Sequence, residues 1–331
     1  MADAVRAVTA HEVLALLKTP QPTCILFHAR PDGDAVGSAF ALAQWLSAMG
    51  SPAWCLCADE VPERLRFLTK GLQESVLPEH CPSTFSSARV ISVDTASPAQ
   101  LGALWERFAD KISLMIDHHG KGTPYADHYI CPQAAACAEV VFDLMAQAGT
   151  DVPAGAAALL YAGISSDTGC FRYSNVTRNT HLCAAALVES GIDAAEINRR
   201  LFEVKSKELL HAEHAGFERL ALHDHGKIAV ITFPYALRAE LGLREEHLET
   251  LVDVARCVQG VEVAVAIRQS TPDGVFRVSM RANVDFDVAR VAAAFGGGGH
   301  RRAAGATLMA VDIAAAERAV VREILNEKAE K

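Results

Sequence analysis

Short apolar runs alternate with longer stretches of helical periodicity through the first half of the chain. Within each run the apolar residues are continuous rather than alternating, which is typical of strands that are buried on both faces. We expect such strands over residues 24–27, 53–57, 89–93 and 111–116. The helical stretches cover residues 1–20, 34–50, 62–69, 98–108, 135–147, 153–162 and 180–190. This alternation predicts an α/β fold, a mainly parallel sheet with helices on both faces.

The pattern changes in the second half. Residues 194–222 are charged and helical in pattern, which predicts a helical connector rather than a flexible linker. After Gly226 we expect three strands, over residues 227–232, 261–268 and 275–281, the last two joined as a hairpin. Helices are expected over residues 245–257 and 286–295. Four glycines follow at 296–299, and after them one more strand and a last helix. The predicted organisation is a first domain over residues 1–193, a helical connector over 194–225, and a smaller α/β domain over 226–331. Residues 74–88 are polar and irregular in pattern.

The charge balance narrows the range of partners. The chain has 31 Lys and Arg against 40 Asp and Glu, a formal charge of −9. Proteins that track long nucleic acid usually carry a basic face, so we expect any nucleic-acid partner to be short or held by local contacts. The N-terminus lacks the apolar core of a signal peptide, and no run reaches the roughly 18 apolar residues that a membrane span needs. We therefore expect a cytoplasmic protein with no membrane partner.

Acidic and imidazole side chains gather where the predicted strands end. His28, Asp32 and Asp34 follow the first strand, Asp94 follows the third, and Asp117-His118-His119 follow the fourth. Because parallel strands end at one edge of a sheet, and open α/β sheets bind their ligands there, we expect these groups to converge. Asp167 lies in a polar segment after a predicted helix, and we expect it to join them from a loop.

Six of these residues are candidate metal ligands: His28, Asp32, Asp34, Asp94, His118 and Asp167. They are too many for one structural zinc ion, which takes four ligands and favours Cys. Carboxylates with two imidazoles suit Mn²⁺, Mg²⁺ or Fe²⁺. Four carboxylates and two divalent ions give a site near neutrality, which an anionic phosphate can approach. The set therefore favours phosphate-ester hydrolysis, with a metal-bridged hydroxide attacking phosphorus in line.

Each group also has a simpler interpretation. Asp32 and Asp34 precede a helix and are suitable for an N-cap and a turn. Asp94 could be an acidic residue in a loop without a ligand, and residues 117–119 could form a turn exposed to solvent. The glycine run is suitable as a hinge, although four glycines also let backbone N–H groups approach an anion closely. The metal site is favoured because all the acidic and imidazole groups occur together at strand ends or in loops.

These motifs resemble a known family. His28-x-x-Pro31-Asp32-Gly33-Asp34, the strand ending in Asp94, Asp117-His118-His119 and Ser166-Asp167-Thr168-Gly169 are similar to the four motifs of the DHH phosphoesterase superfamily. Residues 296–305 resemble the DHHA1 domain. The order of the motifs and the length of the chain resemble the NrnA-like (nanoRNase and pAp-phosphatase) group of that superfamily. The chain departs from the family at Arg30, where Asn is frequent, and at Ser166, where Thr is common.

The resemblance implies a role for each site residue. His28, Asp32 and Asp94 would hold one metal ion, and the other would be held by Asp34, Asp94, His118 and Asp167, with Asp94 bridging. Asp117 would orient a histidine, and His119 would face the scissile phosphate. The substrate's phosphate or terminal nucleotide would be bound in the second domain by Gly297, Gly298, Gly299 and His300, with Arg281 and, as a weaker candidate, Arg268.

The implied activity is a phosphodiesterase that needs two divalent ions, most suitably Mn²⁺. Its substrates would be very short RNA, chiefly dinucleotides such as pGpG or pApA, cut to nucleoside 5′-monophosphates. Removal of the 3′-phosphate of pAp is a second implied activity. Two other functions remain open at this point: a non-catalytic nucleotide-binding sensor and a single-strand exonuclease acting on longer substrates. A homodimer also remains open.

Overall fold

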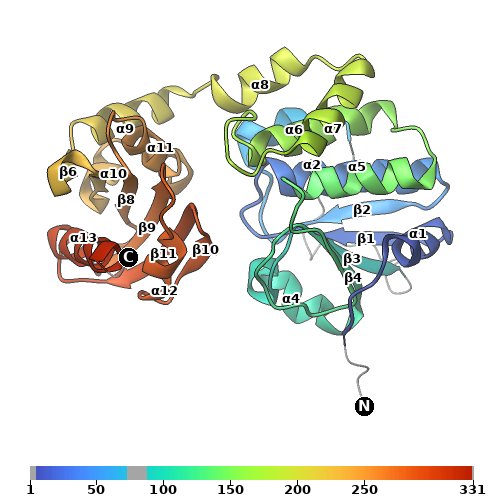
Figure 1. The fold of residues 1–331 in the computed structure, drawn as a ribbon, viewed down its shortest axis with the longest axis horizontal. Helices are drawn as coiled ribbons and strands as arrows, with labels where there is room; N and C mark the ends of the chain where they lie inside the picture. The colour runs from blue at the N-terminus through green and yellow to red at the C-terminus, as the bar shows by residue number, and fades with distance from the viewer. Residues whose placement is uncertain (1–4, 73–87, 330–331) are drawn as a thin grey trace. The chain divides into compact units, whose positions relative to one another are not determined.

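The computed structural model describes residues 5–72 and 88–329, and it divides between Val204 and Lys205 into two compact units (Figure 1). The predicted connector, residues 194–225, spans this division. The irregular segment predicted over residues 74–88 lies almost entirely outside the described residues. Within the described ranges, no helix is both long and apolar enough to cross a membrane.

The first unit is built on a five-stranded sheet in the order β2-β1-β3-β4-β5, and every pairing is parallel. The strands are β1 (Thr23–Leu26), β2 (Ala53–Leu56), β3 (Arg89–Val93), β4 (Ile112–Asp117) and β5 (His128–Ile130). The four predicted strands are present. The edge strand β5 was not predicted, because it has only three half-buried residues and therefore no apolar run.

Helices cover both faces of this sheet, so the predicted α/β fold is confirmed. Figure 1 shows α2 and α5 over one face and α4 over the other, and separate apolar cores lie beneath the two layers. The helices are α1 (Ala10–Lys18), α2 (Gly33–Ala48), α3 (Arg66–Thr69), α4 (Ala103–Phe108), α5 (Cys137–Ala148), α6 (Ala154–Asp167), α7 (Arg178–Glu189) and α8 (Ala194–Phe202). Short 3₁₀ turns lie at Glu63–Leu65, Pro98–Leu101 and Ala109–Lys111.

Two helices differ from the prediction in ways that have physical causes. The helix predicted over residues 98–108 is interrupted at Gly102, whose φ of 55° is not helical. Helix α6 continues five residues beyond the predicted end at Ala162 and finishes at Asp167. Its last residues, from Gly163 to Asp167, are poor helix formers by composition, and their packing against α2 overrides that preference.

Helices α2 and α6 pack unusually closely, and glycines allow it. A Cβ atom on Gly33 would lie 2.6 Å from the Cβ of Ser166, and one on Gly163 would lie 2.9 Å from Asp34 Oδ1. A Cβ atom on Gly37 would lie 2.4 Å from the carbonyl oxygen of Leu159. The absence of these side chains brings the end of α6 close to the start of α2.

Replacing Gly37 with Ala is expected to destabilise the protein by about 1–3 kcal/mol. The new methyl group would meet the backbone of α6, and this cost exceeds the roughly 1 kcal/mol by which Ala is favoured over Gly in a helix. The midpoint of urea unfolding measures the change. Ser47→Ala, at an exposed position of the same helix, is the control. Equal midpoints for the two variants would show that α2 and α6 can separate at little cost.

The second unit is built on a six-stranded sheet in the order β10-β11-β9-β8-β7-β6. Only the pair β7 and β8 is parallel. The strands are β6 (Leu220–His223), β7 (Ile228–Phe233), β8 (Val263–Gln269), β9 (Val275–Ala282), β10 (Gly298–His300) and β11 (Ala303–Met309). The helices are α9 (Lys207–Phe217), α10 (Tyr235–Glu240), α11 (Leu251–Arg256), α12 (Val288–Ala293) and α13 (Ile313–Ala329), with 3₁₀ turns at Asp224–Gly226 and Glu245–Leu248.

The prediction for the second half of the chain needs three corrections. The connector predicted as helical over residues 194–225 is only partly so, because residues 203–206 separate α8 from α9 and the strand β6 follows α9. The helix predicted over residues 245–257 is divided into a 3₁₀ turn and α11, and α10 was missed. The end of the glycine run is not a loop, because Gly298–His300 pair with β11 as an edge strand.

Candidate active site

Three of the sheet's central strands deliver side chains to the same edge. His28 lies two residues beyond β1, Asp94 directly follows β3, and Asp117 is the last residue of β4. Asp34 lies in the first turn of α2, and Asp167 is the last residue of α6 rather than part of a loop as predicted. Sheet and helices therefore both contribute to the cluster.

The first group of predicted ligands consists of His28, Asp32 and Asp94. His28 Nε2 lies 3.7 Å from Asp32 Oδ1 and 3.5 Å from Asp94 Oδ2, and one ligand atom from each residue falls within 4.8 Å of the others. His28 Nδ1 lies 2.9 Å from the carbonyl oxygen of Ala29, to which it donates. This hydrogen bond leaves the Nε2 lone pair directed at the carboxylates, which suits a metal ligand.

The second group consists of Asp34, His118 and Asp167. His118 Nε2 lies 3.3 Å from Asp167 Oδ2 and 3.8 Å from Asp34 Oδ2, and these three residues also meet within 4.8 Å. The carboxylate of Asp34 accepts hydrogen bonds from the backbone N–H groups of Cys137, at 2.6 Å, and Ala138, at 2.9 Å. The start of α5 therefore fixes this buried carboxylate.

Asp94 lies between the two groups. Its Oδ2 faces His28, and its Oδ1 lies 3.6 Å from His118 Nε2. The residue is 2% exposed, and its Oδ1 has no hydrogen-bond partner among the residues that the structure describes. Its φ of 53° is a left-handed conformation that disfavours most side chains. A buried carboxylate oxygen without a hydrogen-bond donor is what a bridging metal ligand would leave in a protein without its ions.

The capping interpretation of Asp32 also holds, and it is compatible with a ligand role. Asp32 Oδ1 accepts hydrogen bonds from the backbone N–H groups of Asp34 and Ala35, both at 3.0 Å, so it is the N-cap of α2. These bonds orient the carboxylate whose Oδ1 also faces His28, and Oδ2 accepts neither of them.

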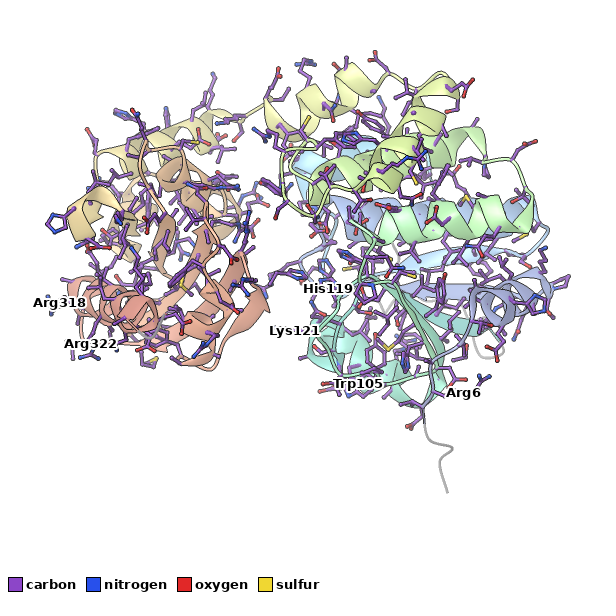
Figure 2. The ribbon with its side chains drawn as sticks, viewed as in Figure 1. Arg6, Trp105, His119, Lys121, Arg318 and Arg322 are labelled. Carbon is purple, nitrogen blue, oxygen red and sulfur yellow. The ribbon has the colours of Figure 1, made fainter. Side chains whose placement is uncertain are left out.

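Asp117 and His119 form a separate pair beside the metal ligands. Asp117 Oδ1 accepts hydrogen bonds from the backbone N–H of His118, at 2.7 Å, and from His119 Nδ1, at 2.7 Å. The histidine that Asp117 orients is therefore His119, which Figure 2 labels. Burial lowers the pKa of His119, but the hydrogen bond to Asp117 and the charge of Asp94 outweigh burial and raise the pKa to about 9.

The crowding of negative charge shows that the site suits cations. Burial raises the pKa of Asp34 well above its ordinary value, and the charges of Asp94 and Asp32 raise it further. Burial and the charge of Asp34 raise the pKa of Asp167 in the same way. Two divalent ions would balance four carboxylates, and carboxylates with imidazoles are ligands of the harder divalent metals. The donor set therefore fits the two ions that the sequence predicts.

Two of the predicted substrate residues of the second unit, Arg281 and His300, lie in one row across neighbouring strands of its sheet. Arg281 on β9 is paired with Ala303 on β11, which is paired with His300 on β10. Paired residues project to the same face of a sheet, so Arg281 and His300 share a face with a small side chain between them. Gly298 lies on this face as well, opposite Gly305.

Gly297 and Gly299 are required by packing. A Cβ atom on Gly297 would lie 2.2 Å from the carbonyl oxygen of Gly305, and one on Gly299 would lie 2.5 Å from that of Ala303. Gly299 also has a φ of 141°. These glycines therefore bring β10 against β11, which explains them without a ligand.

Arg268 differs from the other predicted substrate residues because it is 8% exposed. Its guanidinium donates to Ser279 Oγ at 3.3 Å and lies 3.5 Å from Glu245 Oε1. Arg238 and Arg277 contact the same glutamate. Arg268 is therefore part of an ion-pair cluster. Nothing in the sequence indicated this cluster.

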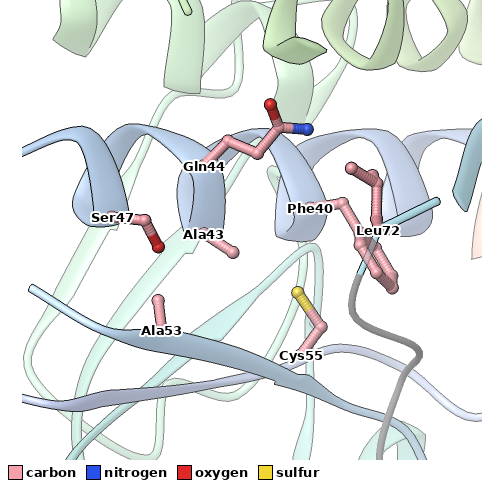
Figure 3. A pocket seen from close by; sticks show the side chains of 7 residues that line it. All are labelled: Phe40, Ala43, Gln44, Ser47, Ala53, Cys55 and Leu72. Carbon is pink, nitrogen blue, oxygen red and sulfur yellow. The ribbon is translucent and has the colours of Figure 1, made fainter.

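A cavity of about 320 Å³ lies elsewhere in the first unit, between α2 and β2 (Figure 3). Its walls include Phe40, Gln44 and Cys55, and none of the predicted site residues lines it. The metal ligands therefore do not belong to this cavity.

Sequence reasoning missed the residues that hold the ligands in place. The glycines at the α2–α6 contact gave no signal because nothing in the sequence shows that the two helices touch. Asn175 was also missed: its Nδ2 donates to the carbonyl oxygens of Ala135 and Asp167, at 3.0 and 3.1 Å, and so connects two segments of the site.

Comparison with known proteins gives consistent matches. Residues 22–164 match the DHH family, N-terminal domain, and residues 226–328 match the DHHA1 domain. The chain is 32% identical over 308 residues to the bifunctional oligoribonuclease and PAP phosphatase NrnA of Thermus thermophilus, covering 92% of this chain and 90% of the relative. It is 29% identical over 291 residues to the protein of the same name from Bacillus subtilis, covering 86% and 88%.

Solved structures share the fold. An exopolyphosphatase-related protein from Bacteroides fragilis superposes with a TM-score of 0.87 at 21% identity, covering 96% of this chain and 97% of that one. RecJ of Thermus thermophilus in complex with Mn²⁺ superposes with a TM-score of 0.53 at 14% identity, covering 97% of this chain and 55% of that one. At these identities the similarity concerns the fold alone.

Proposed function

Because the chain belongs to the DHH family, with a DHHA1 domain after the DHH domain, we propose that it is a Mn²⁺-dependent phosphodiesterase of very short RNA. It cuts dinucleotides to nucleoside 5′-monophosphates and removes the 3′-phosphate of pAp. We place this activity in the cytoplasm. The relatives named as oligoribonuclease and PAP phosphatase support both substrates.

The observation that carries this proposal is the convergence of two ligand groups on one carboxylate. His28 and Asp32 lie with Asp94 on one side, and Asp34, His118 and Asp167 lie on the other. When bound, two divalent ions would supply an activated water and offset charge on the phosphoryl oxygens. The six side chains would hold those ions, and no protein nucleophile is required.

The residues beside the ligands have roles of their own. Asp117 holds His119 through Nδ1, so Nε2 is the ring atom that can exchange a proton or a hydrogen bond with the phosphate. In the second unit, Arg281 and His300 share one face of the sheet, and both can donate to phosphate oxygens. The residue between them, Ala303, has a small side chain.

A substrate panel tests the proposal directly. The protein with Mn²⁺ is incubated with pAp and with RNA of two to about ten nucleotides, and the products are resolved by length. The expected result is rapid cleavage of dinucleotides and dephosphorylation of pAp, with rates that fall as the RNA lengthens. Faster cleavage of the longest RNA would instead indicate a single-strand exonuclease, and binding without turnover would indicate a nucleotide sensor.

His300→Ala is expected to lower kcat/KM on dinucleotides by about 10–100-fold, the value of one hydrogen bond to a charged group. Mn²⁺ affinity should stay unchanged, because His300 belongs to the second unit and the metal ligands to the first. Steady-state kinetics and calorimetric Mn²⁺ titration measure the two effects, with the exposed His214→Ala as control. Loss of Mn²⁺ binding in His300→Ala would contradict this division of roles.

A further inference from the structure

One short segment, residues 134–138, contacts two residues of the second ligand group, His118 and Asp34. The carbonyl oxygen of Ala134 lies 3.3 Å from His118 Nδ1, the ring nitrogen opposite the one that faces the carboxylates. The backbone N–H groups of Cys137 and Ala138 hold Asp34. The carbonyl oxygen of Ala135 accepts a hydrogen bond from Asn175, which also donates to the backbone of Asp167. The position of this segment therefore decides how the second group is arranged.

Glu139 anchors this segment from the first turn of α5. Its side chain is buried, with the residue 1% exposed. Oε2 accepts hydrogen bonds from the backbone N–H of Ala135, at 3.1 Å, and from Thr180 Oγ1, at 3.0 Å. Oε1 accepts a hydrogen bond from Asn179 Nδ2 at 2.8 Å. A carboxylate so deeply buried is costly, and these three bonds, which tie the segment to α7, are what offsets that cost.

We propose that Glu139 is a positioning residue for the second metal ion of this protein. It fixes the segment 134–138, and through that segment it sets the orientation of His118 and the place of Asp34. The inference rests on the proposed two-metal function. Partners that orient metal ligands without touching the metal typically contribute 10–100-fold to metal affinity. We expect a contribution of that size from Glu139.

The hydrogen-bond pattern explains why a neutral amide cannot replace this carboxylate. All three groups around Glu139 donate: the N–H of Ala135, the hydroxyl of Thr180 and the amide N–H of Asn179. A glutamine has one oxygen and one NH₂ group, so one of its ends must place a donor against a donor. Rotation of the Asn179 amide does not relieve the conflict, because its Nδ2 also donates to Asp143 Oδ2, at 3.1 Å.

The test compares Glu139→Gln with Asp143→Asn in the full-length protein. Asp143 lies one turn further along α5 and contacts the same Asn179, but its hydrogen bonds go to Asn179 and Cys183, not to the segment 134–138. Calorimetric titration with Mn²⁺ is expected to show about 10–100-fold weaker binding at one of two sites in Glu139→Gln and unchanged binding in Asp143→Asn. Turnover of Glu139→Gln should recover as Mn²⁺ is raised, which a general loss of stability would not produce.

Asn175→Ala is the second variant, in case Glu139→Gln does not fold. Asn175 is exposed and holds the same segment from the other side, so its loss should weaken the same Mn²⁺ site while the metal-free protein keeps its melting temperature. Native-like Mn²⁺ binding in a folded Glu139→Gln or Asn175→Ala protein would overturn the inference. Absence of Mn²⁺ binding by the native protein would instead refute the proposed function, so the two failures are distinguishable.

Discussion

Replacing Asp94 with Asn is expected to lower Mn²⁺-dependent turnover of dinucleotides and pAp by at least about 10³-fold, because metal ions supply several kcal/mol of transition-state stabilisation. Asp94 is the residue whose two oxygens face the two ligand groups. An amide has only one oxygen and cannot bridge two cations. Asn is the suitable replacement because it tolerates the left-handed backbone that Asp94 adopts, with φ 53°.

Three measurements check this result together. Turnover at saturating Mn²⁺ should be lost, circular dichroism should be unchanged, and the rise in melting temperature that Mn²⁺ gives the native protein should be reduced. Asp110→Asn, which removes an exposed carboxylate from the 3₁₀ turn before β4, is the control and should behave as the native protein. Native-like turnover in Asp94→Asn would show that Asp94 does not connect the two ions.

Replacing His119 with Ala is expected to reduce kcat by about 10²–10⁴-fold, the range for a side chain that transfers a proton in the reaction. The reason is its placement: Asp117 holds Nδ1 at 2.7 Å, so the ring is fixed beside the metal ligands. His119 lies outside the two ligand groups around His28 and Asp34, although its ring also meets Asp94, Asp117 and His118 within 4.8 Å. Mn²⁺ affinity should therefore change little, in contrast to the Asp94 variant.

The measurement is single-turnover cleavage of a dinucleotide combined with Mn²⁺ titration. His128→Ala, which removes a half-buried histidine from the edge strand β5, is the control for loss of an imidazole elsewhere in the unit. If His119→Ala lost Mn²⁺ affinity to the same extent as activity, His119 would be a metal ligand. That outcome is compatible with its 3.7 Å distance from Asp94 but not with the role proposed for it.

The sequence predicted much of the first unit because its signals are local. Continuous apolar runs marked β1 to β4, and the polar residues directly after them had to meet at one edge of a parallel sheet. The placement of His28, Asp94 and His118 follows from that rule alone. Asp34 and Asp32 follow from their position at the start of the helix after β1.

The features that could not be predicted from the sequence depend on contacts between segments that are distant along the chain. Asp167 reaches the site because α6 continues past Gly163 against α2, and nothing local indicates that contact. The role inferred for Glu139 depends on Ala135 and on Thr180, 41 residues away along the chain. In the second unit, the burial of Arg268 depends on Glu245, which local pattern could not connect to it.

The close contact between α2 and α6 also limits how this protein can change over evolutionary time. Because main-chain atoms meet at Gly37 and Leu159, backbone geometry sets the separation of these helices. Apolar residues elsewhere in the core can be exchanged for others of similar volume without moving the two helices apart. Substitutions in the core therefore leave the spacing between Asp34 and Asp167 unchanged. A change in metal preference would require substitution of the ligand residues themselves.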